Sequence, residues 1–197
     1  MNELDWQQLQ HHPLWQSLSL PAWQAAAPLW QPCHYQRDQH LLRAGEPQPR
    51  LWLLMEGLVR FYYLTPAGKE FNKSFALPGH LLGSLSTLLA SQPAPFHIQA
   101  LQPCRAYLLQ GAGLQQLAAS HPDWQALQLR LLQQLALRKE QREADFLLCS
   151  ASERYQQFLQ EHAEVAEQIA NYHIASYLGI TEVALSRIRQ RQRTTSA

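Results

Sequence analysis

The sequence lacks an uninterrupted apolar run of about 18 residues, so it predicts no membrane-spanning helix. Charged residues are also scarce, at 16% of 197 residues, and the formal net charge is only +1. This balance excludes a polycation that binds nucleic acid along its whole length. Its first residues, Met-Asn-Glu-Leu-Asp-Trp, are acidic and polar, unlike a signal peptide, and we expect a cytoplasmic protein with no membrane partner.

Metal-ligand patterns are missing as well. The three cysteines are Cys33, Cys104 and Cys149. They lie far apart, form no CxxC pair and lack the spacing of an iron–sulfur ligand set, so we interpret them as reduced structural thiols. No His-x-His motif is present, which a metalloenzyme of the cupin-like barrels would need. We therefore expect no metal, no iron–sulfur cluster, no other cofactor and no enzymatic activity.

What the sequence does contain is a helix-turn-helix pattern at residues 171–191. Gly179 lies where a first helix must end, and glycine adopts the left-handed conformation there at little cost. Thr181 follows at a position suited to cap a second helix. The residues expected to face each other across the two helices are Ile174, Ala175, Leu178, Leu185 and Ile188. In such a unit the second helix enters the DNA major groove.

Positive charge is concentrated in that second helix. Residues 182–197 contain four Arg and one Glu, whereas residues 153–167 contain one Arg and four Glu. Arginine bonds bidentately to guanine edges and to phosphates, so we expect DNA binding to be local to this helix. The predicted DNA-binding residues are Thr181, Glu182, Ser186, Arg187, Arg189, Gln190 and Arg191. An ordinary helical hairpin with a solvated basic end is the alternative.

The middle of the chain, from about residue 31 to 111, has the pattern of β structure. Leu51–Met55 and Leu58–Leu64 are short β-rich runs separated by Glu56-Gly57. Further strands are expected at 96–100 and 104–109, with a short helix at 84–90. On the second run, alternation predicts one face with Val59, Phe61 and Tyr63 and the other with Arg60 and Tyr62. Short strands with frequent turns are typical of an antiparallel sandwich or barrel.

A long helix is predicted next, from about residue 122 to 148, with Pro122 near its first position. It would be about 40 Å long, more than a small domain can cover. We expect a parallel seam with a second copy of the chain, formed by Leu127, Leu131 and Leu135. A helix packed on its own barrel is the alternative.

The order of these parts resembles the Crp/Fnr transcription regulators over about residues 30 to 193. The matching segments are Ala44-Gly45-Glu46 with Leu51–Arg60, Phe75–Gly79 with Gly83, Ala151–Tyr155, and Ile174–Thr181 with Leu185–Ile188. The resemblance implies an α+β chain in three parts. Residues 1–120 would form a sensor domain, with N-terminal helices and a double-stranded β-helix (a cupin-like β-roll). Residues 121–149 would be the dimerisation helix and 150–197 the helix-turn-helix domain, for which we expect no full β-wing.

The resemblance also implies a function. The protein would be a homodimeric, sequence-specific transcription regulator that binds a pseudo-palindromic site in double-stranded DNA. It would contact RNA polymerase if it is an activator. A ligand- or protein-binding module whose helix-turn-helix is vestigial is the alternative. Many members have glutamate where this chain has Val183, which can at most touch a thymine methyl, so its base preference should differ.

The family's effector pocket corresponds here to Gly83, Ser84, Leu85, Phe96 and His97. Cyclic-nucleotide members carry a glutamate for the ribose at the position of Ser84, and an arginine pair for the phosphate at Phe96-His97. A buried phosphate needs a cation or several donors, so we expect this site to reject cyclic AMP. It would take a less charged ligand or be filled by its own side chains. Haem ligation by His34, His80 or His97 is an alternative, although a lone histidine is more often structural.

Overall fold

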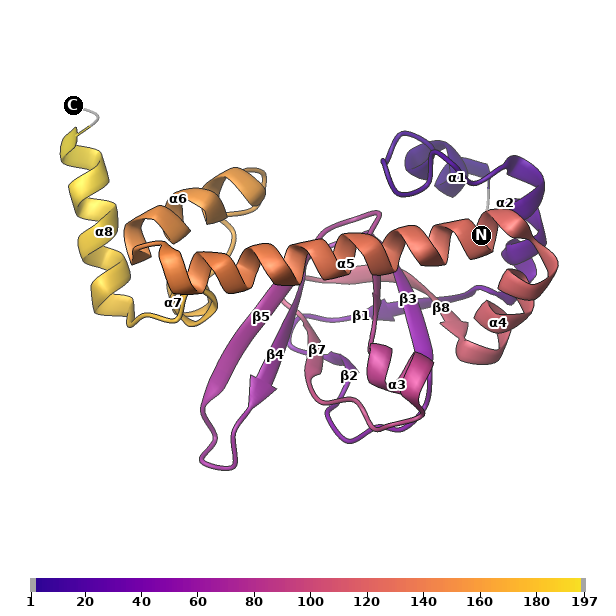
Figure 1. The fold of residues 1–197 in the computed structure, drawn as a ribbon, viewed down its shortest axis with the longest axis horizontal. Coiled ribbons are helices and arrows are strands. Elements are labelled where there is room, and N and C mark those ends of the chain that lie inside the picture. The colour runs from indigo at the N-terminus through magenta and orange to yellow at the C-terminus, as the bar shows by residue number, and fades with distance from the viewer. Residues whose placement is uncertain (1–2, 196–197) are drawn as a thin grey trace.

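The computed structural model describes residues 3–195, so the predicted domains 1–120 and 150–197 each extend two residues beyond it (Figure 1). The chain begins with α1 (Glu3–Leu9), α2 (Leu20–Ala26) and a short 3-10 turn, η1 (Ala27–Leu29). The strands are β1 (Gln31–Tyr35), β2 (His40–Leu42), β3 (Arg50–Glu56), β4 (Val59–Leu64), β5 (Glu70–Ala76), β6 (Leu81–Gly83), β7 (His97–Ala100) and β8 (Cys104–Gln110), with α3 (Leu85–Ala90) after β6. The remaining helices are α4 (Gly111–Ser120), α5 (Pro122–Leu148), α6 (Ala151–Glu161), α7 (Asn171–Leu178) and α8 (Glu182–Thr195).

The strands form a roll of two antiparallel sheets, in the orders β1-β8-β3-β6 and β2-β7-β4-β5. Apolar side chains from both sheets, among them Trp52, Val59 and Ile98, fill its interior. Gly57 joins β3 to β4 at a positive φ of 95°, and a Cβ there would lie 2.5 Å from the Pro103 carbonyl oxygen. Only glycine fits that turn. The predicted α+β class, the antiparallel roll and the strand positions are confirmed.

Pairing of β4 with β5 contains an irregularity that shifts the register. Phe61 lies opposite Ser74 and Tyr62 opposite Asn72, so Lys73 is an extra residue in β5. A bulge of this kind re-aims the side chains around it. The predicted alternation of β4 is correct for Phe61, but Tyr62 on the opposite face is buried as well.

Helix α5 runs along most of the length of the molecule, and α8 lies beyond its C-terminal end (Figure 1). Its first turns pack in a second apolar core, between the N-terminal helices and the sheet that contains β3 and β8. In this core the ring of Trp15 contacts those of Trp23 and Trp124, with centroids 5.7 and 6.3 Å away. The Trp124 indole N–H also donates to the Ala22 carbonyl, 2.9 Å away. The start of α5 is therefore fixed to its own roll.

The last three helices gather at the other end of α5 and share a third core (Figure 1). Phe158 of α6, Ile174 of α7 and Leu185 of α8 are buried there. Leu58 and Phe75 of the roll belong to the same cluster. The C-terminal helices thus pack directly on the roll, in addition to being connected to it through α5.

Candidate nucleic-acid interface and effector site

Helices α7 and α8 and the turn between them form the predicted helix-turn-helix. Gly179 ends α7 in the left-handed conformation, with φ of 71°, and its N–H donates to the carbonyls of Ala175 and Ser176. Thr181 then caps α8, because its hydroxyl accepts from the Ala184 N–H at 3.2 Å. Both local predictions are confirmed, and the turn fixes the direction in which α8 leaves the domain.

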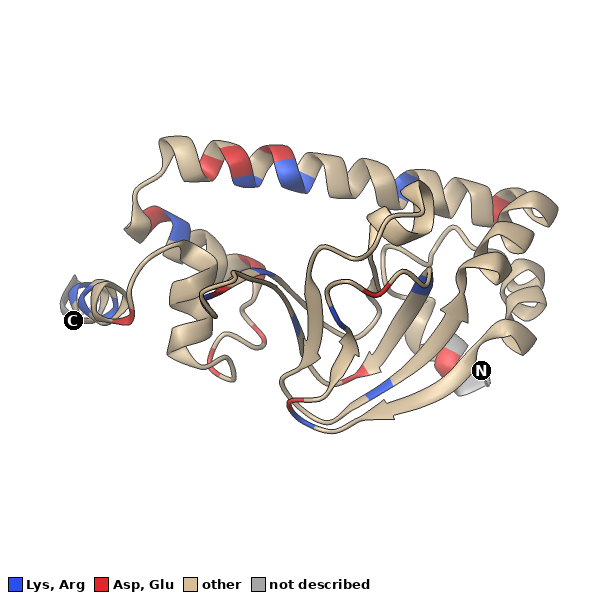
Figure 2. Ribbon diagram, turned by 90° about the horizontal axis from the view of Figure 1, so that it is seen from below, with Lys and Arg blue, Asp and Glu red and all other residues tan. Residues whose placement is uncertain are grey.

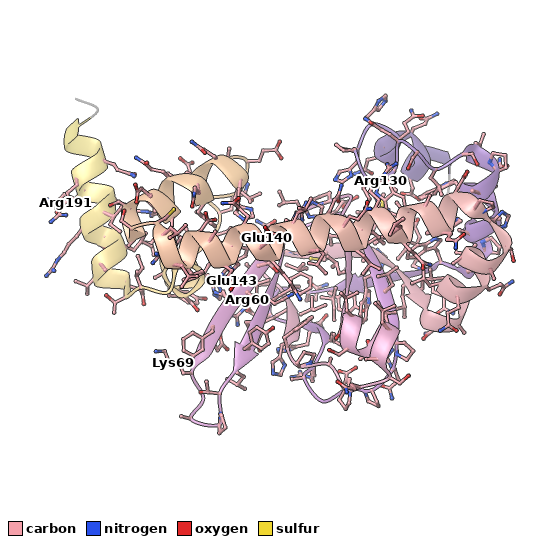
Figure 3. All side chains as sticks on the ribbon, viewed as in Figure 1. Arg60, Lys69, Arg130, Glu140, Glu143 and Arg191 are labelled. Carbon is pink, nitrogen blue, oxygen red and sulfur yellow. The ribbon has the colours of Figure 1, made fainter. Side chains whose placement is uncertain are left out.

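Helix α8 has one buried and one exposed face. Leu185 and Ile188 are buried against α6 and α7. The opposite face is exposed along most of the helix and contains Val183, Ser186, Arg187, Gln190 and Arg191. Thr181 and Glu182 are exposed at its start. Figure 3 shows Arg191 on the far side of α8 from the roll.

Arg189 lies apart from that face. Its Nε donates to the Tyr155 hydroxyl at 2.8 Å, and its Nη1 donates to the Asn171 side-chain oxygen. Residue 189 follows Leu185 by four positions, which puts both on the inward side of the helix. Arg189 therefore braces α8 against α6 and α7, unlike Arg187, and the sequence pattern did not distinguish the two arginines.

The predicted dimer seam needs a correction. Leu127 is only 1% exposed because it packs into the core of its own protomer, where a second chain cannot reach it. Leu131 packs against the same core and Leu135 is half-buried. These three residues share one face of α5, and that face is turned toward the roll. The alternative, a helix packed on its own barrel, is correct for this half of α5.

The predicted pocket residues do not all meet at one site. Ser84 is fully buried beside Gly83, and its hydroxyl has no hydrogen-bond partner among the described residues. Leu85 is partly exposed at the start of α3, and Phe96 fills the roll interior beside Phe61, with ring centroids 5.7 Å apart. His97, the first residue of β7, points to the outside of the same sheet, because its neighbour Ile98 points into the roll interior and successive side chains of a strand face opposite ways.

On that outer surface His97 stacks on the Tyr62 ring, with centroids 4.8 Å apart. The Tyr62 hydroxyl pairs with His40 Nε2 at 2.8 Å. Partial burial lowers the pKa of both His40 and His97, as does the nearby Arg43. His40 and His97 therefore lie on the outer surface of this sheet, where both contact Tyr62.

Lys73, the extra residue of β5, was missed by the sequence interpretation. Its ammonium lies over the rings of Phe96 and Phe61, at 4.4 and 5.3 Å from their centroids. Burial lowers the pKa of Lys73 to about 8, and Lys139 and Arg142 of α5 contribute. No sequence signal could have found this residue, because the bulge that re-aims it depends on strand pairing.

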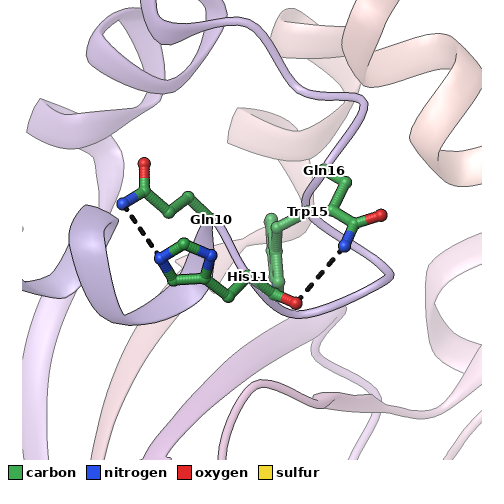
Figure 4. Close-up of a pocket in the computed structure, with 4 residues that line it drawn as sticks. All are labelled: Gln10, His11, Trp15 and Gln16. Atoms are coloured by element: carbon green, nitrogen blue, oxygen red, sulfur yellow. Dashed lines mark hydrogen bonds between the residues drawn. The ribbon is translucent and has the colours of Figure 1, made fainter.

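Among the described residues there is no group of three or more His, Cys, Asp or Glu side chains that could hold a metal ion. In the part of the chain described, no helix is long and apolar enough to cross a membrane. A surface depression lies near the N-terminus, lined by Gln10, His11, Trp15 and Gln16 (Figure 4). It contains none of the predicted pocket residues.

Comparisons with known proteins agree with this geometry. Residues 32–121 match the family model of the cyclic nucleotide-binding domain. The anaerobic regulatory protein of Pasteurella multocida (strain Pm70) is 27% identical over 165 residues, which are 78% of this chain and 59% of that relative. The chain thus corresponds to about three fifths of the relative's length.

Solved structures extend the match to the C-terminal helices. The c-di-GMP-responsive global regulator CLP of Xanthomonas campestris superposes with a TM-score of 0.73 at 14% identity, covering 90% of this chain and 93% of that one. FixK2 of Bradyrhizobium japonicum gives 0.71 at 24% identity, covering 85% and 86%. These likenesses show the fold. Over residues 32–121 the chain is therefore similar to the cyclic nucleotide-binding domain, and it shares its overall fold with CLP and FixK2.

A further feature that the sequence pattern did not indicate is the burial of Arg60 in β4. The side chain is 5% exposed, and its Nε donates to the Gln99 side chain at 2.8 Å. Its guanidinium lies 4.0 Å from the centroid of the Tyr62 ring and pairs with Glu70. In the sequence this position had only the alternation of a half-exposed strand, which favours a solvated arginine. The cover comes from α7, more than 100 residues later.

Proposed function

We propose that this protein is a homodimeric, sequence-specific DNA-binding transcription regulator, and that α8 reads the major groove. The observation that supports it best is the exposed face of α8, which combines arginine, glutamine, serine and valine on a helix whose other face is buried. Arginine and glutamine are side chains that bond base edges, and a helix of this kind fits the major groove. Double-stranded DNA and a second copy are the proposed partners, with RNA polymerase added if the regulator is an activator.

The first test is selection of a binding site from random duplex DNA, followed by affinity measurements on single variants. Arg187→Ala should cost about 1–3 kcal/mol and relax the preference at one base pair of each half-site. Arg191→Ala should weaken binding to all sequences alike and reduce the salt slope by about one. Selection of no sequence by the wild-type protein would favour the vestigial helix-turn-helix.

Val183 gives this proposal a sharper test. The side chain is 62% exposed at the start of α8, and it shares a face with Arg187, four residues later. An exposed apolar residue at the tip of a reading helix is suited to the methyl group of thymine. Replacing thymines of the selected site one at a time by uracil removes only that methyl. We expect one such position to weaken wild-type binding and to leave Val183→Ala unaffected.

For the homodimer we propose the outer face of α5 in place of the predicted seam. Leu129, Leu132, Ala136 and Leu147 are exposed there at positions that share one side of the helix. Glu140 and Glu143 follow on the same side, and Figure 3 shows them on the C-terminal half of α5, so the apolar contact that we propose is the stretch from Leu129 to Ala136. A second copy fits this stripe because a parallel pair of helices buries the leucines of both chains at once.

Sedimentation of Leu129→Glu tests this seam. The substitution would place two carboxylates beside the two-fold axis, and we expect a folded monomer with weakened operator binding. Leu89→Glu is the matched control, because Leu89 is equally apolar and exposed but lies on α3. A Leu129→Glu protein that stays dimeric would show that the copies meet elsewhere.

We also propose that the roll does not bind cyclic AMP. Phe96 fills the interior where a phosphate-binding arginine would be needed, and His97 faces the outside of the sheet. Lys73 is a nearby cation, but it lies on the rings of Phe61 and Phe96. Calorimetry with millimolar cyclic AMP should show no heat, and operator affinity should not change. Micromolar binding that also raises operator affinity would overturn this part of the proposal.

A further inference from the structure

Helix α7 of the DNA-reading domain covers the edge of the roll. Strand β5 is the outermost strand of its sheet, so one side of its backbone has no strand partner. The Asn72 N–H on this side donates to the Ser176 hydroxyl at 2.9 Å, and that hydroxyl donates to the Glu70 carbonyl at 3.1 Å. Ser176 thus supplies the pairing that a neighbouring strand would supply.

The Asn72 side chain adds a second link across the same edge. Its Nδ2 donates to the His173 carbonyl at 2.9 Å and lies 3.2 Å from His173 Nδ1. Arg60 Nη1 also lies 3.2 Å from that Nδ1, and both Arg60 and His173 are buried. Arginine can only donate, so His173 Nδ1 must accept and the imidazole is neutral. Buried polar groups matched in this way fix one geometry, because a shift would leave several of them unpaired.

The covalent connection between the two domains is short by comparison. Helix α5 ends at Leu148 and α6 begins at Ala151, so only residues 149–150 lie between them. Such a link allows rotation, so the contacts with the roll decide the orientation. The third core at Leu58 and Phe75 is non-directional, whereas the hydrogen bonds with β5 demand one geometry. While α7 is docked on β5, Arg191 of the exposed face of α8 points away from the roll (Figure 3). Docking leaves the reading face open, as a DNA-binding geometry requires.

We infer that Asn72, His173 and Ser176 are positioning residues that dock α7 on β5 and so fix the separation of the two reading helices on an operator. The inference rests on the proposed function. A dimer reads two half-sites about one helical turn apart, so its affinity depends on where each α8 points. A domain loosened from β5 would still read a half-site, but it would no longer favour one spacing.

The test compares three DNA duplexes: the selected operator, the same operator lengthened by one base pair at its centre, and an isolated half-site. For the double variant Asn72→Ala/Ser176→Ala we expect about a tenfold loss of affinity for the selected operator. We also expect weaker discrimination against the lengthened operator and unchanged half-site binding. Ser74→Ala, the same change at a serine of β5 that faces Phe61 of β4 across the ladder, should behave as wild type.

Two further variants keep the test decisive. Ser176→Thr retains a hydroxyl and should restore spacing discrimination relative to Ser176→Ala, which a general loss of stability would not predict. Ser176→Ala alone replaces the double variant if that does not fold. The inference would be overturned if the variants at Asn72 and Ser176 all discriminated between the two operator lengths as wild type does. A gain in operator affinity would also overturn it, because the docked state would then be inhibitory. Failure of the wild type to bind any duplex would instead overturn the proposed function.

Discussion

The two ends of helix α5 are fastened in different ways. At the end near the roll, Trp124 and Leu127 are buried in an apolar core with the N-terminal helices. At the other end Leu147 is 76% exposed, and the contacts that α5 itself makes with the helix-turn-helix domain are mostly hydrogen bonds and cation–π contacts. Arg142 donates to the Tyr177 carbonyl at 2.9 Å and lies 4.0 Å from the centroid of its ring. Figure 2 shows most charged positions of α5 toward this end.

This difference has a physical consequence. Apolar burial is strong and non-directional, so it holds the first half of α5 firmly whatever the exact side-chain geometry. Hydrogen bonds contribute less net free energy but demand particular distances and angles. Burial therefore holds the roll end of α5, which we call the fixed base. The reading end of α5 is held by a few directional contacts, and we call it the adjustable mount, although the helix-turn-helix domain also packs on Leu58 and Phe75 of the roll.

The largest expected effect tests the fixed base. Leu127→Ala should lower the free energy of unfolding by about 2–5 kcal/mol, because it leaves a cavity in a packed core. Leu129→Ala, two residues away on the exposed side, should act only through dimerisation. Urea unfolding at several protein concentrations separates the two, since an effect on the dimer shrinks as the protein is diluted. If Leu127→Ala and Leu129→Ala lowered the free energy of unfolding equally at every protein concentration, the assignment of the two faces of α5 would be wrong.

Sequence patterns predicted the elements because their signals are local. Gly179 and Thr181 specify the turn of the helix-turn-helix through backbone conformation and capping, which need only neighbouring residues. The long helix was likewise predicted with the bounds observed, from Pro122 to Leu148. The pattern of the roll strands depends on alternation, which is also local.

The sequence could not predict which side chains are buried and which are exposed, because this depends on contacts with residues far away in the chain. Leu127 and Leu129 are equally apolar, and only the packing of the N-terminal helices decides which one is buried. Arg60 is buried because α7 folds back over β4 and β5, which no spacing near residue 60 indicates. His97 was grouped with Phe96 by position in the chain, yet Phe96 lies just before β7 and packs in the roll interior, whereas His97 begins β7 and stacks on Tyr62 outside the sheet.

A second effect concerns pH at the reading end. Burial, with Arg60 nearby, lowers the pKa of His173 to about 4, while Glu70 and Asp38 oppose the shift and Arg37 adds to it. In the unfolded chain the histidine regains its ordinary pKa near 6.5. The neutral form therefore stabilises the fold fully above pH 6.5, and this contribution falls as the pH drops toward 4.

Acid should also affect the fixed base, because burial lowers the pKa of His80 to about 4. Urea unfolding of wild type and His173→Gln at pH 7 and pH 5 isolates the contribution of His173, because His80 and His162, whose pKa is also lowered by burial, are present in both proteins. We expect the variant to be less stable at pH 7 and to lose less stability between the two pH values. If both proteins lose the same free energy of unfolding between pH 7 and pH 5, His173 does not contribute to the acid sensitivity. The docking of α7 would then depend on its other contacts.

The smallest expected effect lies where the end of α5 touches the turn of the helix-turn-helix. Gly179 has φ of 71°, and a Cβ added there would lie 2.9 Å from the Phe146 ring of α5. Gly179→Ala should cost about 1–2 kcal/mol from the left-handed backbone. The Phe146 ring, half-exposed beside Arg142 and Arg154, can shift away, so little further cost is expected. The contact is measured by making Gly179→Ala in wild type and in Phe146→Ala. If the Phe146 ring shifts aside, Gly179→Ala will cost the same free energy of unfolding in both proteins. A cost that largely disappears in Phe146→Ala would instead show that this end of α5 is packed as rigidly as the first.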